Sequence, residues 1–180
     1  LINTMKNYLK PFKGSIILCI SLFMLGCNNP LEKQSELELA QNILEKNITM
    51  YETVWNNIIN DREIDSINEN YFDKDVTALA TSGGDIIGLE NFKNYYNNYL
   101  TGFSDAEFTI VDIFGQGDKM VKHWNFKGTH DGDFFGVPAT GKAINISGTT
   151  LIRMKEGKIA AEQDFMDFLS FYKQLGLLAQ

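Results

Sequence analysis

The sequence predicts an α+β domain in which helices come first and a sheet follows. Three observations support this prediction. Apolar residues recur with helical spacing in the first half of the chain, hairpin-like segments rich in β-branched and aromatic residues fill the second half, and no internal repeat is present. With 180 residues, of which 44% are hydrophobic, the chain is long enough for one domain with its own core.

The first predicted helix begins at Ser35, because Ser35 and Glu38 have the spacing of a capping box. Apolar side chains then recur at steps of three and four residues, which places them on one helical face. This stripe consists of Leu37, Ala40, Leu44, Ile48, Tyr51, Trp55 and Ile59. We expect the stripe to pack against a sheet.

Shorter elements follow along the chain. A short helix is predicted over residues 62–68, a strand over 76–81, and a loop over 82–85 because of its paired glycines. A second amphipathic helix then ends near Gly102. Its apolar face carries Leu89, Phe92, Tyr96 and Tyr99.

Four strands and a last helix complete the domain. The strands are predicted over residues 107–114, 119–129, 143–155 and 158–167. Gly115-Gln116-Gly117-Asp118 and Glu156-Gly157 between them are typical of antiparallel hairpins. The last helix is predicted over 168–178, with Leu169, Tyr172 and Leu175 on one side. We therefore expect a curved antiparallel sheet packed against N-terminal helices.

Residues 1–26 have the pattern of an export signal. Lys6, Lys10 and Lys13 precede an apolar run over residues 15–25, which is shorter than the roughly 20 residues of a membrane-spanning helix. The segment Met24-Leu25-Gly26-Cys27 resembles a bacterial lipobox, which implies cleavage before Cys27 and lipidation of that cysteine. We thus predict a signal peptide over 1–26, a tether over 27–34 and a domain over 35–180. An ordinary secretory signal and an uncut anchor are the alternatives.

The predicted export and the net charge limit the kinds of partner that the protein can bind. A lipidated Cys27 implies a protein of the cell envelope, anchored to a membrane on the periplasmic or outer surface. Loss of the three leader lysines would change the net charge from −7 to −10, and an acidic domain of this kind is a poor match for nucleic acid. The second cysteine, Cys19, lies in the leader, so the domain has no internal disulfide.

Motifs for a cofactor or a metal are missing from the sequence. Gly-rich phosphate loops, paired-histidine signatures and nucleophile elbows do not occur. The cluster His130-Asp131-Gly132-Asp133 has metal-binding residue types, but neighbours in an extended chain rarely converge on one ion. We predict neither a metal nor a cofactor.

Residues 128–142 carry the most specific motif, GTHDGDFFGVPATGK. This segment resembles the GxHxGxFxGxPxTGK signature of SnoaL-like polyketide cyclases, also called ester cyclases, which have the NTF2-like cone fold. The resemblance extends over about residues 37–178, through Trp55-Asn56, Tyr71, Arg153, Gly157-Lys158-Ile159 and Gln174-Leu175-Gly176. It implies that the predicted sheet forms a cone with an apolar interior.

The resemblance assigns the acid/base position of these cyclases to Asp164. There, a carboxyl group in an apolar cavity removes a proton α to a carbonyl and returns one to the new alkoxide, without metal or cofactor. Family members place a histidine and a glutamine on the preceding strand, where this chain has Thr150 and Gly148. A threonine cannot carry a proton as imidazole does. Alternatively, Asp164 faces solvent or only orients a ligand.

Several other residues are candidates for the binding site. His130 either donates a proton at the pocket mouth or pins the Gly-rich loop, and turn chemistry favours the second role. Met166 and Asp167 follow the acid/base position along the chain, and Thr150 remains able to donate a hydrogen bond. Aromatic residues are expected in the core or the pocket wall, namely Tyr51, Trp55, Trp124 and Phe126.

Two functions remain open at this point. In the first, the pocket of an exported lipoprotein binds a small, mostly apolar carbonyl compound and transforms it through Asp164, by chemistry of the aldol cyclase or isomerase type. In the second, the domain is a non-catalytic small-molecule-binding or assembly module at the cell envelope, which the lipid anchor favours. We also expect a homodimer through the outer face of the sheet, because Val111, Ile113, Ile144 and Ile146 indicate apolar residues on both faces.

Overall fold

The structure is a computed structural model that describes residues 30–81 and 83–178. The described residues from Leu37 onward belong to one compact unit, and residues 30–36 do not belong to it. The predicted signal peptide and Cys27 lie outside the described residues. Within the described part of the chain, no helix is both long and apolar enough to cross a membrane.

Helix α1, Pro30–Ile59, is longer than the sequence predicts. It begins at Pro30 rather than Ser35, because proline lacks the amide hydrogen that the first helical turn leaves unbonded. The Ser35 hydroxyl donates instead to the carbonyl of Glu32, at 2.8 Å, so the predicted capping box does not form. The predicted stripe is buried only in its second half: Leu37 is 63% exposed, whereas Tyr51 is fully buried.

The next elements are the 3₁₀-helix η1 (Ile64–Ser66), β1 (Phe72–Thr81), β2 (Gly84–Ile87) and α2 (Leu89–Gly102). The predicted loop over 82–85 is shorter than expected, because β2 begins at Gly84 and pairs antiparallel with β1. Arg62 caps the end of α2 by donating to the carbonyls of Leu100 and Phe103, at 2.6 and 3.1 Å. This contact satisfies carbonyl groups that a helix end leaves without partners.

The second half supplies β3 (Glu107–Gln116), β4 (Lys119–Thr129), β5 (Ala143–Lys155) and β6 (Lys158–Met166). The bounds of β4 and β5 are those predicted. The six strands have the order β2-β1-β6-β5-β4-β3. The prediction of an antiparallel sheet is wrong at one pair, since β1 and β6 run parallel. Parallel neighbours need a long crossover, which the chain provides here because α2 and four strands lie between β1 and β6.

The hairpin between β5 and β6 turns tightly at Glu156 and Gly157. Both residues have positive φ, at 52° and 76°. A two-residue turn with these angles matches the twist of the strands that it joins, which is why a glycine follows Glu156. The register across this hairpin places Thr150 opposite Asp164.

Helix α3, Phe168–Gln174, is shorter than predicted. Asp167 is its N-cap and accepts a hydrogen bond from the Ser170 amide at 2.9 Å. The predicted buried face is wrong for two of its three residues: Leu169 and Tyr172 are exposed, whereas Phe171 and Leu175 are buried. The residue spacing of a seven-residue helix allows either of two faces to be buried. Packing of α3 against the end of the sheet decides which face is buried.

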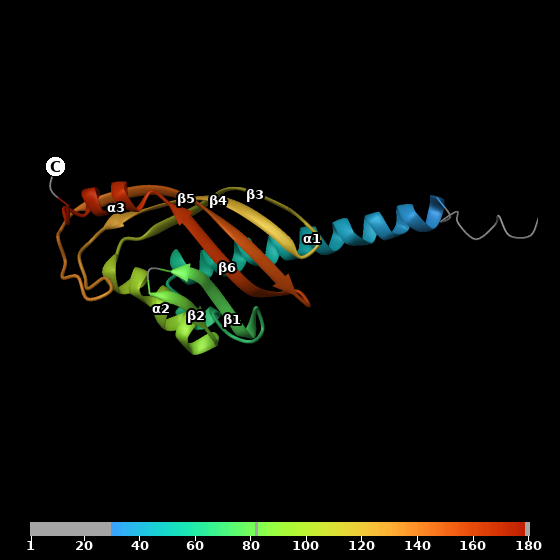
Figure 1. The fold of residues 1–180 in the computed structure, drawn as a ribbon, viewed down its shortest axis with the longest axis horizontal. Helices are drawn as coiled ribbons and strands as arrows, with labels where there is room; N and C mark the ends of the chain where they lie inside the picture. The colour runs from blue at the N-terminus through green and yellow to red at the C-terminus, as the bar shows by residue number, and fades with distance from the viewer. Residues whose placement is uncertain (1–29, 82, 179–180) are drawn as a thin grey trace, which may run out of the picture. The chain divides into compact units, whose positions relative to one another are not determined.

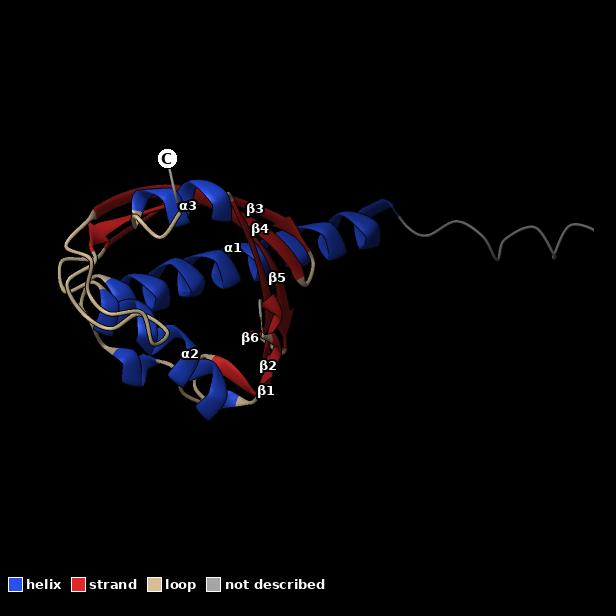
Figure 2. Cartoon of the chain, turned by 60° about the vertical axis from the view of Figure 1, so that its left-hand side comes forward, coloured by secondary structure: helices blue, strands red, loops and turns tan. Residues whose placement is uncertain are grey.

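The sheet curves around the buried half of α1 and around α2, as Figures 1 and 2 show. Buried and exposed side chains alternate along β4 and β5, so every second residue points toward the interior. Ile144 and Ile146 are buried on that inner side, not on the outer face where a dimer would form. The outer face nevertheless exposes apolar side chains, among them Val111, Phe114, Leu151 and Phe165.

Candidate active site

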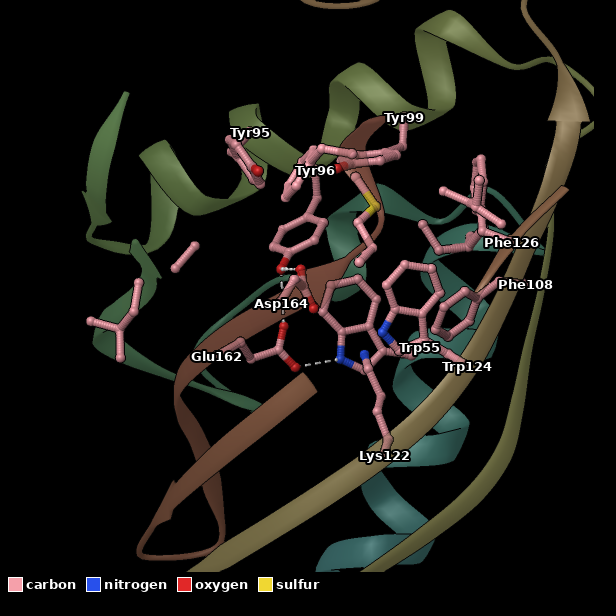
Figure 3. A pocket seen from close by; sticks show the side chains of 16 residues that line it. Trp55, Tyr95, Tyr96, Tyr99, Phe108, Lys122, Trp124, Phe126, Glu162 and Asp164 are labelled. Carbon is pink, nitrogen blue, oxygen red and sulfur yellow. Dashed lines mark hydrogen bonds between the residues drawn. The ribbon is translucent and has the colours of Figure 1, made fainter. Parts of the chain in front are cut away.

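The curved sheet and the helices enclose a cavity of about 90 Å³. Five residues predicted from the sequence line it, namely Trp55, Trp124, Phe126, Asp164 and Met166. The structure adds lining residues that the sequence analysis did not assign to a site, including Tyr95, Tyr96, Tyr99, Phe108, Lys122 and Glu162. Figure 3 shows these side chains converging from α1, α2 and the strands.

Asp164 faces the cavity and accepts hydrogen bonds on both carboxylate oxygens. The hydroxyl of Thr150 donates to Oδ1, and the hydroxyl of Tyr96 lies 3.2 Å from Oδ2. Strand register produces the first contact, because Thr150 stands opposite Asp164 on the neighbouring strand. The side chain is half-buried, so its carboxylate meets both the cavity and two donors.

Glu162 lies two residues before Asp164 on the same inner face of β6 and is only 1% exposed. Its Oε1 accepts from the Tyr51 hydroxyl and from Trp55 Nε1, the latter at 3.1 Å. Its Oε2 lies 3.2 Å from the Tyr96 hydroxyl. Burial raises the pKa of Glu162, because a charged carboxylate loses its water, and the charge of Lys122 opposes this rise.

Lys122 brings a cation into the apolar wall. Its side chain is 3% exposed, and its Nζ lies 4.7 Å from the Trp55 ring centroid, 4.9 Å from Tyr51 and 5.1 Å from Phe108. The negative faces of these rings attract an ammonium group. Burial lowers the pKa of Lys122, whereas the two nearby carboxyl groups act in the opposite direction.

Trp124 on β4, together with Gly148 and Thr150 on β5, orients the Asp164 carboxylate. A Cβ on Gly148 would lie 2.3 Å from Cζ2 of the Trp124 indole, so only glycine leaves room for this ring. In this position Trp124 Nε1 donates to Thr150 Oγ1 at 2.9 Å. Thr150 in turn donates to Asp164, so a continuous chain of donors orients the carboxylate.

The remaining predicted site residues do not line the cavity. Tyr51 and Thr150 contact the two carboxyl groups from behind, and Asp167 caps α3. His130 is fully buried in the Gly-rich loop, where its Nδ1 lies 3.0 Å from Thr140 Oγ1. Its ring packs 5.4 Å from the ring of Phe103.

Strand alternation contains the signal for two of the lining residues that were not predicted, Glu162 and Lys122. Glu162 has the same parity as Asp164, and Lys122 has the same parity as Trp124 and Phe126. Tyr96 belongs to the predicted apolar face of α2. Among residues 30–81 and 83–178, no group of three or more histidine, cysteine, aspartate or glutamate side chains is placed to hold a metal ion.

Curated relatives match a short part of the chain. The aklanonic acid methyl ester cyclase DnrD of Streptomyces peucetius is 43% identical over 49 residues, which are 27% of this chain and 34% of that enzyme. The aklanonic acid methyl ester cyclase DauD of Streptomyces sp. (strain C5) has the same identity over the same length, which is 30% of its own chain. The matched segment is thus about a third of each relative.

Solved structures match most of the domain. TsrD from Streptomyces laurentii has a TM-score of 0.64 at 20% identity, covering 76% of this chain and 97% of its own. A phenazine biosynthesis-related protein from Pseudomonas aeruginosa has a TM-score of 0.63 at 18% identity, covering 78% and 87%. These likenesses show a shared fold. Because the model of the SnoaL-like polyketide cyclase family matches residues 46–175, the chain belongs to that family.

Proposed function

We propose that the cavity binds a small, mostly apolar carbonyl compound and that Asp164 removes and returns a proton on the carbon next to the carbonyl. The observation that carries the proposal is the position of this carboxylate, which faces an aromatic cavity while Thr150 and Tyr96 hold both of its oxygens. A base held in one orientation in a mostly apolar site has the geometry that general acid–base catalysis requires.

Lys122 complements Asp164 in this chemistry. Removal of an α-proton moves an electron pair onto the carbonyl oxygen, which becomes an enolate. Lys122 lines the same cavity, and its charge in a water-poor site would stabilise that oxygen. The site therefore contains a base and a cation, the two groups that enolate formation needs.

The cavity limits the size of the ligand. Its volume of about 90 Å³ is below the roughly 300–1,000 Å³ of sites for drug-sized molecules. An engineered protein cavity of about 150 Å³ holds benzene. The cavity is smaller than that, so we infer a ligand no larger than one ring. Phe168, which is 47% exposed, marks the side on which the cavity wall meets solvent.

Isotope exchange tests the proposal without knowledge of the natural substrate. One-ring ketones and short β-keto esters are incubated with the protein in deuterated water, and loss of the α-proton is followed by NMR. Asp164→Asn is expected to lower the exchange rate by about 10²–10⁴-fold. Asp112→Asn, at an exposed carboxylate of β3, is the matched control and should leave it unchanged.

A non-catalytic binding module is the second candidate, and the lipobox-like segment ending at Cys27 favours it. An envelope protein meets few intermediates of cytoplasmic biosynthesis. Calorimetric binding of the same ketones without any proton exchange would identify the protein as a binder and refute the catalytic proposal.

Lipidation at Cys27 is a separate part of the proposal, based on the basic and apolar leader. We expect the membrane-extracted protein to begin at Cys27 and to carry acyl chains that hold it in the membrane. Intact mass measures both features, and Cys27→Ala should remove the lipid. A different N-terminus in a protein that partitions into water would refute it.

A further inference from the structure

The hydroxyl of Tyr96 is shared by two carboxyl groups. It lies 3.2 Å from Glu162 Oε2 and 3.2 Å from Asp164 Oδ2. Figure 3 shows it pointing between the two side chains, which project from the same face of β6. Tyr96 is buried, with 7% of its surface exposed, and the two carboxyl groups are the side chains within hydrogen-bonding distance of its hydroxyl.

A phenol has one proton, so it can donate only one of these two hydrogen bonds. The other contact between oxygens becomes a full hydrogen bond when that carboxyl group is protonated and donates to the phenol oxygen. This geometry points to one protonated carboxyl group in the pair. If both were ionised, Tyr96 would leave one carboxylate oxygen without a donor, at a cost that is large in a buried site.

The surroundings identify the protonated group. Glu162 is 1% exposed, whereas Asp164 is half-buried and faces the cavity. Oε1 of Glu162 accepts from Tyr51 and Trp55, which leaves Oε2 as the oxygen that can carry a proton toward Tyr96. Both oxygens of Asp164 have donors, Thr150 and Tyr96, as suits an ionised carboxylate. Each donor in this network then donates one hydrogen bond.

We propose that Glu162 and Asp164 share one proton through Tyr96, and that Glu162 holds it at rest. The catalytic meaning of this relay rests on the proposed function of Asp164. With the proton on Glu162, Asp164 is a base. When the Tyr96 proton moves to Asp164 Oδ2 and the Glu162 proton moves to Tyr96, Asp164 becomes an acid, Glu162 becomes a carboxylate, and Tyr96 is unchanged.

Other titratable groups around the pair fit this exchange. Tyr51 on α1 contacts Glu162. Burial raises the pKa of Tyr95 and Tyr99 on α2, and the negative charge of Asp164 adds to this rise. Lys122 on β4 interacts with both carboxyl groups. Its charge balances the single negative charge of the pair in either arrangement. Glu162 is thus a positioning residue that acts on the ligand only through Tyr96 and Asp164.

Infrared spectroscopy of the full chain tests the relay without a ligand. A protonated carboxylic acid has a carbonyl band that is separate from carboxylate bands. At neutral pH we expect this band to be present and to shift when glutamate, but not aspartate, carries an isotope label in its side-chain carboxyl. Glu162→Gln should remove it, while Glu52→Gln, at an exposed position of α1, should not.

A second variant distinguishes a shared proton from simple burial. In Asp164→Asn the new amide would donate to the Tyr96 oxygen, so the phenol would donate to Glu162, and the glutamic acid band should disappear. Burial of Glu162 alone would leave this band in place. Absence of the band in the parent chain, or its persistence in Asp164→Asn, would overturn the proposal.

Kinetics separate this inference from the proposed function. Glu162→Gln copies the protonated acid, since its oxygen can accept from Tyr51 and Trp55 while its amide donates to Tyr96. It should keep KM for the exchanging ketone, lower kcat about tenfold or more, and remove one limb of the pH–rate profile. A band without any proton exchange would refute the proposed function alone. Exchange with an unaltered profile in Glu162→Gln would refute the relay alone.

Discussion

The indole of Trp124 packs over the backbone of Gly148, on the neighbouring strand, so closely that a Cβ would lie 2.3 Å from Cζ2. The two residues are opposite each other in the register of β4 and β5. This packing places Trp124 Nε1 2.9 Å from Thr150 Oγ1, and Thr150 then donates to Asp164. A residue without a side chain thereby controls the orientation of the carboxylate.

Gly148→Ala is expected to destabilise the domain by about 1–3 kcal/mol, because the added methyl group overpacks the inner face of the sheet. It should also displace Trp124 from Thr150 and lower α-proton exchange. Urea denaturation and the exchange assay measure the two effects. Gly117 lies at an open turn with positive φ, so Gly117→Ala strains the backbone without overpacking the interior. This control variant should leave the rate of α-proton exchange unchanged.

The stability of the parent chain should fall with rising pH above the pKa of an unfolded glutamate, about 4.3. Burial raises the pKa of Glu162 in the folded state, so between the two pKa values the unfolded chain has released a proton that the folded chain retains. The unfolded state then binds fewer protons, and unfolding becomes easier as pH rises through this window.

Glu162→Gln should remove that contribution. The variant and the parent are expected to have similar stability at acidic pH, and the variant should be the more stable at neutral pH. The difference corresponds to about 1.4 kcal/mol for each unit that separates the two pKa values. Urea midpoints at several pH values measure it. A constant difference across the pH series would contradict the pKa shift.

Lys122→Met should lower both stability and function. Methionine fills a similar volume, but it leaves the negative charge of the Glu162–Asp164 pair without its cation and removes the contacts of the ammonium group with the aromatic rings, so we expect a lower melting temperature than that of the parent. Loss of the cation should reduce α-proton exchange on the scale of one electrostatic contact, about 10²–10³-fold. Lys119→Met, at an exposed position of β4, should change neither quantity.

We predict that the outer face of the sheet pairs with a second copy of the chain. Val111, Phe114, Leu151 and Phe165 are 51%, 59%, 44% and 50% exposed on β3, β5 and β6. Sedimentation at micromolar concentration should reveal a dimer, and Leu151→Lys with Phe165→Lys should yield a folded monomer. A parent chain that sediments as a monomer throughout this range would refute the prediction.

Local patterns in the sequence specify some elements of this fold and leave others open. Alternation and turn residues predicted β4 and β5 to the residue, because local geometry decides where a hairpin strand begins and ends. The parallel pairing of β1 with β6 and the buried face of α3 were not predicted, since both depend on contacts between segments far apart in sequence. The sequence also did not decide which face of β6 points toward the cavity, although Glu162 and Asp164 lie on the same face.

The sequence by itself determined the α+β class, the strands of the second half, the family and the candidate Asp164, because these reside in local periodicity and in short motifs. Only the tertiary structure decided what surrounds that carboxylate. Curvature of the sheet brings Tyr96 from α2, Lys122 from β4 and Glu162 from β6 to one cavity. Their protonation follows from burial and from the number of hydrogen-bond donors, and both are properties of the folded molecule rather than of any segment.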